Sequence, residues 1–203
     1  MARKRGVTLE QVLSVSEGLA DAEGLDGVTL AAVARALGIR SPSLYSHVDG
    51  LGHLLRLLAL SAAGKMESEF REAAGELKGA AALRAMAHRY RDFARRHPGC
   101  YAAAQRAVRP GEDEELYAAL AGVVSPVLRA LEEAGAAPGE RIHLARALRS
   151  ALHGFVELER MGGFGMPEAV DASFDHLVEL ILSGVRSQTG RKTKGAFGTK
   201  GSH

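Results

Sequence analysis

The sequence predicts an all-helical protein with a small head of three short helices and a larger helical body. Ala, Leu, Arg and Glu are abundant, and these residues favour helices. Apolar residues recur at helical spacing, while runs of β-branched and aromatic residues with period-two alternation are missing from the 203 residues. The pattern predicts about nine helices, of which the first three are short and closely spaced.

The first two helices have caps that local sequence predicts. Thr8 can cap the first helix while Gln11 reaches back to the backbone, which is the capping-box arrangement, and Gly24 ends that helix. Thr29 can cap a second, short helix over residues 30–37. Each hydroxyl stands directly before an apolar helical pattern, so both helix starts follow from neighbouring residues alone.

A turn and a third short helix come next. Gly38 ends the second helix, and Ser41 with Pro42 predicts the cap and first position of a helix that runs to about His47. A long fourth helix is expected over about residues 51–75. Because the composition changes near residue 50, the boundary between head and body is expected there.

Five more helices are predicted in the body, each bounded by Gly or Pro. They span about residues 80–97, 101–108, 112–134, 140–161 and 167–186. We therefore expect a helix-turn-helix head at 1–50, a ligand-binding and dimerisation body at 51–186, and a disordered tail at 187–203 that is rich in Gly, Lys and Thr.

Composition excludes several classes of protein. A hydrophobic content of 46% supports a substantial core, and the single cysteine excludes an internal disulfide and a Cys-rich metal site. No apolar run approaches the roughly 18 residues of a membrane span, and none follows the basic start, so we expect a cytoplasmic protein. Since the net charge is only +2, affinity for nucleic acid must come from local charges, such as the N-terminal arm of Arg3, Lys4 and Arg5.

Residues 30–48 carry the most informative pattern. Ala34 supplies the small residue that a helix crossing needs, and Gly38 can take the left-handed turn conformation four residues later. After that turn, polar side chains such as Arg40 and Tyr45 are expected to face outward. They suit hydrogen bonding to phosphates and base edges in a DNA major groove. The alternative is an ordinary three-helix corner with no role in DNA binding.

The run Val33–Gly38, followed by residues 41–48, resembles the DNA-binding signature of the TetR family, and the similarity covers about residues 8–60. The resemblance implies a homodimeric, ligand-responsive transcriptional repressor whose two heads read a palindromic operator in double-stranded DNA. Together with the basic arm, it implies these DNA-contacting residues: Thr29, Arg40, Ser41, Pro42, Ser43, Tyr45 and His47.

One position departs from the family pattern. Many members place a lysine that contacts a phosphate at the start of the fourth helix, where this chain has Leu51. The helix N-terminus can still offer backbone amides to a phosphate, and His53 can assist. The departure therefore concerns the affinity for DNA and not the fold.

A second resemblance lies in the body. Residues 148–159, with Phe164 and residues 174–178, resemble a TetR C-terminal type marked by Trp and then His-Gly, and Arg149 stands where the tryptophan would be. The expected pocket has aromatic walls with Arg149 and His153 as polar groups, so its small-molecule ligand is expected to be largely apolar or aromatic, with one polar or anionic group. The expected pocket residues are Met86, Tyr90, Phe93, Tyr101, Tyr117, Arg149 and His153. The apolar members of this set can instead simply pack the core.

The last two helices are expected to pair with those of a second subunit in a four-helix interface. Their expected apolar contacts are Leu144, Leu148, Leu152, Phe155, Leu177, Leu180 and Ile181.

No cofactor, metal or catalytic chemistry is expected. His153 and Glu157 have the i,i+4 spacing of metal ligands but lack an evident third ligand, so a buried, hydrogen-bonded histidine is the preferred interpretation. Nucleophile elbows, phosphate-binding Gly-rich loops and HExxH motifs are absent from the sequence. The rival hypothesis is an all-helical small-molecule-binding or catalytic protein with a vestigial DNA-binding head. Leu51 mildly favours this rival, and Arg40 argues against it.

Overall fold

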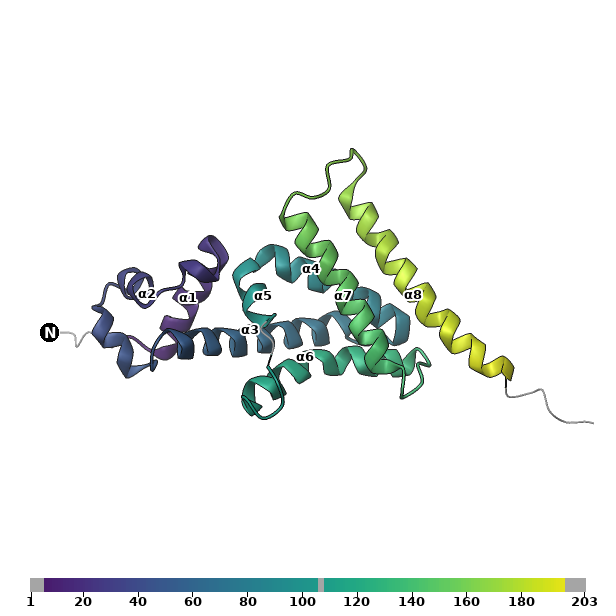
Figure 1. The fold of residues 1–203 in the computed structure, drawn as a ribbon, viewed down its shortest axis with the longest axis horizontal. Coiled ribbons are helices and arrows are strands. Elements are labelled where there is room, and N and C mark those ends of the chain that lie inside the picture. Colours follow the sequence, from purple (N-terminus) through teal and green to yellow (C-terminus); the bar gives the residue numbers. More distant parts are fainter. Residues whose placement is uncertain (1–5, 106–107, 196–203) are drawn as a thin grey trace, which may run out of the picture. The chain divides into compact units, whose positions relative to one another are not determined.

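A computed structural model of the chain describes residues 6–105 and 108–195, and every regular element in these ranges is a helix (Figure 1). The elements are α1 (Leu9–Glu23), η1 (Leu25–Gly27), α2 (Leu30–Leu37), η2 (Ser41–Ser46), α3 (Leu51–Ala74), α4 (Gly79–Arg96), α5 (Pro98–Ala104), α6 (Glu114–Glu133), α7 (Arg141–Arg160) and α8 (Val170–Gly195). All nine predicted helices are confirmed, and the short 3₁₀ helix η1 is additional. Over the same residues, none of the helices is both long and apolar enough to cross a membrane.

The predicted caps of the first two helices are confirmed. The Thr8 hydroxyl accepts a hydrogen bond from the Gln11 amide at 3.3 Å, and the Gln11 side chain accepts one from the Thr8 amide at 3.0 Å. The Thr29 hydroxyl accepts from the amide of Ala32 at 3.1 Å. Each threonine thus satisfies an amide that the helix itself leaves unpaired.

The prediction that Ser41 caps the third helix is wrong. The carbonyl of Arg40 accepts the first helical hydrogen bond, from the amide of Ser43 at 2.9 Å, so Arg40 is the N-cap and Ser41 is the first residue of η2. The element is a 3₁₀ helix of six residues. Pro42 stands in its first turn, where a missing amide hydrogen costs no helical bond.

The C-terminal end also differs from the prediction. Helix α8 continues to Gly195, beyond the expected end at residue 186, so residues 187–195 are helical and not disordered. No proline follows Pro167 that would stop the helix. Residues 196–203 of the expected tail, and the basic arm of Arg3, Lys4 and Arg5, lie outside the described residues.

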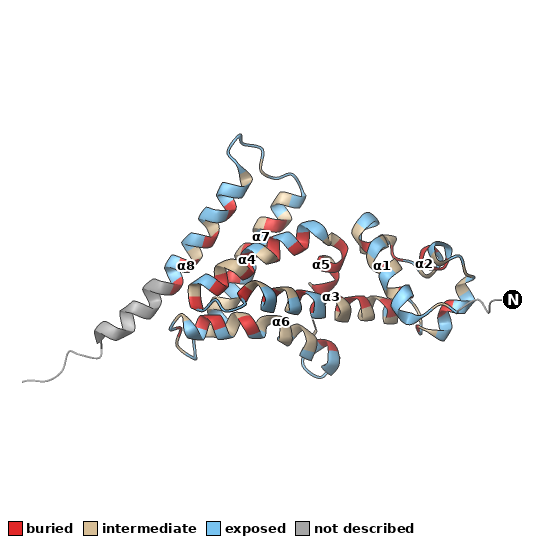
Figure 2. Cartoon of the chain, turned by 180° about the vertical axis from the view of Figure 1, so that it is seen from behind, coloured by how far each residue is buried: buried red, intermediate tan, exposed pale blue. Residues whose placement is uncertain are grey.

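The chain divides into two compact units, each described here by itself. The first contains residues up to Met66 together with Phe93–Gly122, and the second contains Glu67–Asp92 and the residues from Val123 onward. Buried residues run along the inward faces of the helices in both units (Figure 2). The functional boundary expected near residue 50 falls within the first unit and stays a prediction.

Within the first unit, the start of α5 lies directly on α1. A Cβ atom placed on Gly99 would come within 2.0 Å of the carbonyl carbon of Ala20, so only glycine fits this approach. The Asp21 carboxylate accepts hydrogen bonds from the amides of Gly99 at 2.8 Å and Cys100 at 3.1 Å. Helix α1 of the predicted head is therefore held to α5 by backbone contact and by a carboxylate at a helix N-terminus.

We predict that Gly99→Ala destabilises the protein by about 3 kcal/mol or more, because the added methyl group meets backbone atoms that cannot rotate away. Gly18→Ala on α1 is the matched control, since a Cβ there meets nothing within 4 Å and alanine is the better helix former. Urea unfolding followed by circular dichroism gives both free energies. An unchanged midpoint for Gly99→Ala would contradict the close approach of α5 to α1.

Candidate nucleic-acid interface

The turn between α2 and η2 has the geometry that a helix-turn-helix requires. Gly38 has φ 67°, in the left-handed region that favours glycine. The amide of Ile39 donates to the carbonyl of Ala34 at 3.0 Å, and the amide of Gly38 donates to that of Arg35 at 3.1 Å, which is a Schellman ending. Ala34 itself is buried, so the small side chain lies where the two elements meet.

One side of helix η2 is buried in the head, and its other side is exposed to solvent. Leu44 and Val48 are buried in the head, and η2 packs against α2. The opposite side carries most of the predicted DNA-contacting residues. Arg40, Pro42, Ser43 and Tyr45 are exposed, whereas Ser41 and His47 are half-buried. Tyr45 is 60% exposed. Large aromatic side chains are usually more buried than this unless they lie in a binding surface.

Thr29 keeps a hydrogen-bonding function besides its cap. Its hydroxyl oxygen accepts the amide of Ala32, which leaves the hydroxyl hydrogen available to donate to a phosphate. The residue is exposed at the start of α2.

At the start of α3, this chain has Leu51 where the TetR signature often has a phosphate-binding lysine, so other groups must bind the phosphate there. Leu51 is 38% exposed at the first position of the helix. The ring of His53 accepts a hydrogen bond from the amide of Asp49 through Nδ1 at 3.1 Å. When the ring is neutral, its proton is then on Nε2, so that nitrogen is a donor. The first-turn amides and this ring are the groups that α3 can offer to a phosphate.

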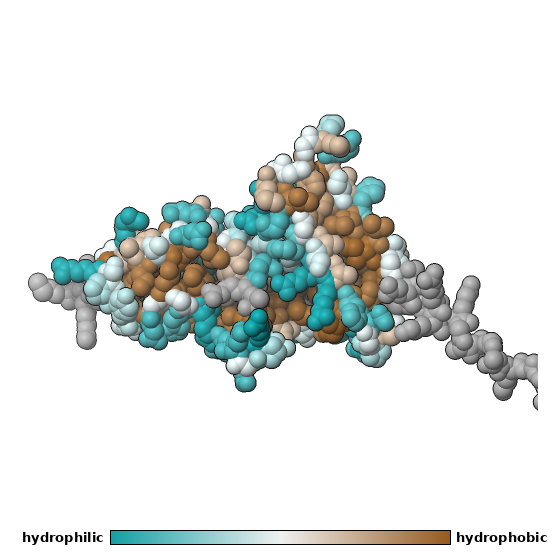
Figure 3. Space-filling model, in the orientation of Figure 1, coloured by the Kyte–Doolittle hydropathy of each residue, from teal (hydrophilic) through white to brown (hydrophobic). Residues whose placement is uncertain are grey.

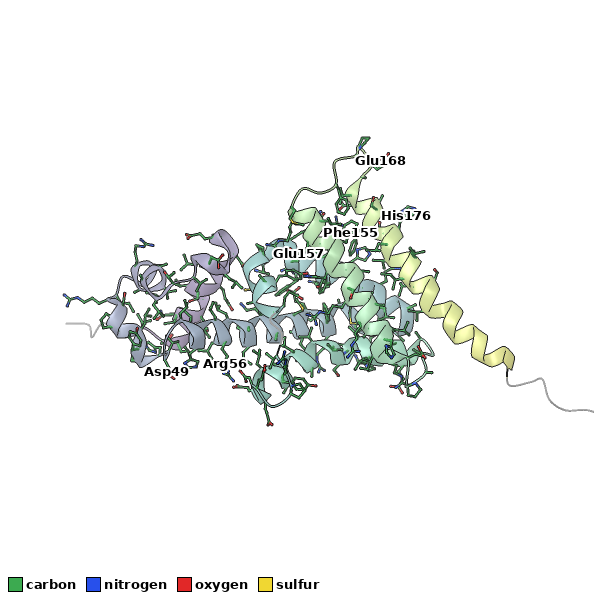
Figure 4. All side chains as sticks on the ribbon, viewed as in Figure 1. Asp49, Arg56, Phe155, Glu157, Glu168 and His176 are labelled. Carbon is green, nitrogen blue, oxygen red and sulfur yellow. The ribbon has the colours of Figure 1, made fainter. Side chains whose placement is uncertain are left out.

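Sequence reasoning missed an ion-pair cluster on the same helix. The Arg56 guanidinium donates to both carboxylate oxygens of Asp113 and, at 2.7 Å, to Glu115, so α3 is joined to the start of α6 (Figure 4 labels Arg56). The Arg56 hydrogen bonds, with that from the Leu116 amide, lower the pKa of Asp113 to about 2. The carboxylates in turn raise the pKa of Arg56. With 57 residues between the partners, no local pattern predicts this contact.

The predicted pocket residues fall into two groups. Met86, Tyr90, Phe93 and Tyr101 are buried, and the ring of Tyr90 lies 6.4 Å from that of Phe70. In contrast, Tyr117 is 46% exposed and Arg149 is exposed, with His153 half-buried. Met86, Tyr90, Arg149 and His153 belong to the second unit, and Phe93, Tyr101 and Tyr117 belong to the first. Their role as a pocket stays a prediction, and the four buried residues equally serve as core.

The predicted dimer residues also separate by exposure. Leu148 and Leu152 are buried within the chain itself and pack its own core. Leu180 is 71% exposed, whereas Leu144, Phe155, Leu177 and Ile181 are half-buried. Leu180 is thus the member of the set most open to a second subunit.

The remaining candidates for chemistry are few. Within residues 6–105 and 108–195, no three His, Cys, Asp or Glu side chains are grouped as a metal site would require. Cys100 is buried, and burial, with Asp21 and Glu17 nearby, raises the pKa of its thiol to about 12. The thiol is therefore protonated at neutral pH and a poor nucleophile.

Known proteins resemble this chain over most of its length. The family model "Tetracyclin repressor-like, C-terminal domain" matches residues 83–181. YobS of Bacillus subtilis, named as an uncharacterized HTH-type transcriptional regulator, is 33% identical over 91% of this chain and 96% of its own length. Rv0681 of Mycobacterium tuberculosis, with the same description, is 34% identical over 93% of this chain and 86% of its own.

Solved structures agree with these relatives on the fold. The transcriptional regulator SCO7222, a TetR from Streptomyces coelicolor, superposes with a TM-score of 0.67 at 17% identity, over 90% of this chain and 99% of that one. The head geometry and the relatives define a helix-turn-helix transcriptional regulator as the class of protein. Within that class, the chain belongs to the TetR family.

The lowered pKa of Asp113 leads to a prediction about acid. The pKa of Asp113 in the folded protein, about 2, lies below the ordinary value near 3.9. The ion pair with Arg56 therefore stabilises the folded state fully above about pH 4. That contribution is lost as the pH falls toward 2. We predict that Arg56→Gln raises the pKa of Asp113 toward its ordinary value without reaching it, because the Leu116 amide still donates to the carboxylate, as measured by NMR titration of the side-chain carboxyl carbon. A pKa still near 2 in the variant would mean that another group holds the carboxylate.

Proposed function

We propose that this protein is a homodimeric repressor that binds a palindromic DNA operator through η2 and releases it when a small, largely apolar or aromatic molecule binds the body. The observation that carries the DNA-binding half is the pairing of a rigid support with an exposed polar face. Leu44 and Val48 hold η2 in place, while Arg40, Ser43 and Tyr45 stay exposed. Membership of the TetR family supports the same interpretation.

The proposed contacts divide by chemistry. Arg40 and Ser43 have the donors that read base edges or phosphates, and Tyr45 adds a hydroxyl on a flat apolar ring. Thr29 at the start of α2 and the first turn of α3 with His53 are placed to hold phosphates. Because Leu51 stands at the start of α3, backbone amides there take the place of a lysine in phosphate binding, alongside the basic arm of Arg3, Lys4 and Arg5.

The proposed second subunit packs on the outward faces of α7 and α8. On α7 the exposed positions repeat at helical spacing and include small residues that allow close approach: His143, Ala147, Ser150, Gly154, Leu158 and Met161. On α8, Ser173, Leu180 and Gly184 are exposed on one side. Apolar side chains reach the surface along both helices (Figure 3), and His176 extends from the side of α8 turned away from α7 (Figure 4). A second copy of the chain would cover these groups, as a two-fold interface does.

The proposed ligand is a small molecule that is largely apolar or aromatic. Within the second unit, Tyr90 on α4 is a buried aromatic residue with a polar hydroxyl and lies beside Phe70, a combination that suits an aromatic molecule bearing one polar group. A ligand that prefers one position of the helices around it would change the affinity for DNA by its difference in binding free energy, typically about 1–3 kcal/mol.

We predict that Arg40→Ala and Tyr45→Ala each weaken operator binding by about 1–3 kcal/mol without changing stability, because both side chains are exposed in the free protein. The measurement is a mobility shift with the DNA upstream of the protein's own gene, at several salt concentrations. Tyr117→Ala is the matched control, since Tyr117 is another exposed tyrosine and lies on α6. Undiminished binding by both head variants would exclude η2 as the reading element. No binding by the intact protein to this or any selected DNA would favour the rival, a small-molecule-binding or catalytic protein.

We predict that Leu180→Glu yields monomers. Leu180 is 71% exposed in the single chain and would be buried between subunits, so the substitution would bury a charge in the interface. Leu77→Glu, in the turn between α3 and α4 and 49% exposed, should leave the dimer intact. Sedimentation velocity over a concentration series separates the two outcomes. Since one head alone loses the second half-site, operator affinity should fall with the dimer. A dimeric Leu180→Glu variant would move the interface elsewhere.

A further inference from the structure

Helices α4 and α8 in the second unit are joined by a ladder of ion pairs. Arg91 lies 2.8 Å from Asp171, His88 lies 3.6 Å from Asp175, and Arg84 lies 2.6 Å from Glu179. The positions descend along α4 as they ascend along α8, with one helical turn between rungs. The two helices therefore run antiparallel with a defined register.

The rung at the start of α8 differs from the other two because its arginine is buried. Only 6% of Arg91 is exposed. Its guanidinium carbon lies 4.7 Å from the ring centroid of Phe174 on α8 and 5.4 Å from that of Phe155 on α7. It also donates two hydrogen bonds to Glu159 on α7, at 2.9 and 2.6 Å. One planar cation thus contacts α4, α7 and α8 through hydrogen bonds and aromatic faces together.

The connection between α7 and α8 cannot hold these helices at a fixed angle by itself. Residues 161–169 are largely exposed and contain Gly162, Gly163 and Gly165. Phe164 is the linker residue that turns back, and its ring lies 4.7 Å from that of Phe155. Arg91 contacts residues near both ends of this linker: Glu159 and Phe155 on α7, and Asp171 and Phe174 on α8 (Figure 4 labels Phe155). The angle between α7 and α8 is therefore held by their direct packing together with this cluster.

A small change in the angle between α7 and α8 produces a large displacement of the exposed residue Leu180 on α8. Leu180 is nine residues beyond Asp171, or about 14 Å along the helix axis at about 1.5 Å per residue. A tilt of about 10° at Asp171 would displace Leu180 by about 2 Å, which exceeds the tolerance of about 0.5 Å for a well-fitted contact. On this helix the ladder residues Asp171, Asp175 and Glu179 face α4, whereas Leu180 lies on the other side.

We propose that Arg91 is a positioning residue for self-association, which sets the angle of α8 on α7 so that their outward faces fit a second copy of this chain. The proposal rests on the homodimer of the proposed function. Arg91 touches no second subunit in this role and acts through Asp171, Glu159 and the two phenylalanine rings. Removing the Asp171 rung loosens α8 while Arg91 keeps its Glu159 partner, so the fold survives and the fit of the dimer is lost.

The test compares dimer dissociation constants by sedimentation velocity for Asp171→Asn, Arg91→Lys and Glu179→Gln. Asp171 has a side chain 75% exposed, so its variant should fold normally, and lysine at 91 keeps the charge but not the planar fork. We expect both to weaken the dimer at least tenfold. Glu179→Gln, which removes the charge of the exposed rung with Arg84, should change it less than twofold. Circular dichroism and urea unfolding of each variant report whether the chain itself stays folded.

A double-mutant cycle separates positioning from general loosening. Leu180→Ala and Asp171→Asn alter residues too far apart to touch, so independent effects on the dimer constant would multiply. If Asp171 acts by placing Leu180, the double variant is weakened by clearly less than the product of the two single effects. Folded Asp171→Asn with wild-type dimerisation, or multiplying effects in the cycle, overturns the positioning role while leaving the dimer itself in place. A wild-type protein that is monomeric at all concentrations overturns the homodimer and this inference together.

Discussion

The arrangement of the first unit depends on the direct contact between the backbones of α1 and α5. Gly99 leaves no side chain between them, and Asp21 accepts the first two amides of α5 with one carboxylate oxygen. His97 approaches the other oxygen of the same carboxylate at 3.1 Å. Because these groups belong to the backbone or to short side chains, the contact leaves little room for α5 to shift on α1. The predicted head is therefore joined to α5 as well as to the continuous helix α3.

Charged side chains connect the starts of three helices to their neighbours, while apolar side chains pack the rest of the helix contacts. Arg56 fastens the start of α6 to α3, Asp21 fastens the start of α5 to α1, and Arg91 fastens the start of α8 to α4 and α7. Each joint involves the N-terminal end of a helix, where unpaired amides and the helix dipole make carboxylates useful. Directional hydrogen bonds fix angles that apolar packing, which has no preferred direction, leaves freer.

Local sequence was sufficient for the helix-turn-helix itself. The caps at Thr8 and Thr29, the left-handed Gly38 and the buried Ala34 all depend on residues within a few positions of one another. The Ser-Pro pair at 41–42 predicts a cap at Ser41, and this prediction is wrong. The carbonyl of Arg40 decides the matter, and carbonyl hydrogen bonding cannot be read from residue types. Helical periodicity predicts the apolar faces of the body's helices, but it does not predict what covers each face.

What the sequence alone determined is the helical class, the order of the elements and the helix-turn-helix motif, since helix periodicity, capping and turn chemistry act over short distances. Only the tertiary structure decided that Leu148 and Leu152 are core residues while Leu180 is exposed, although all three are leucines on amphipathic helices. It also decided the pairing of Arg56 with Asp113 and of Arg91 with Glu159, across 57 and 68 residues of chain. These outcomes follow from which helices pack together, and helix packing depends on contacts between distant parts of the chain that no local pattern contains.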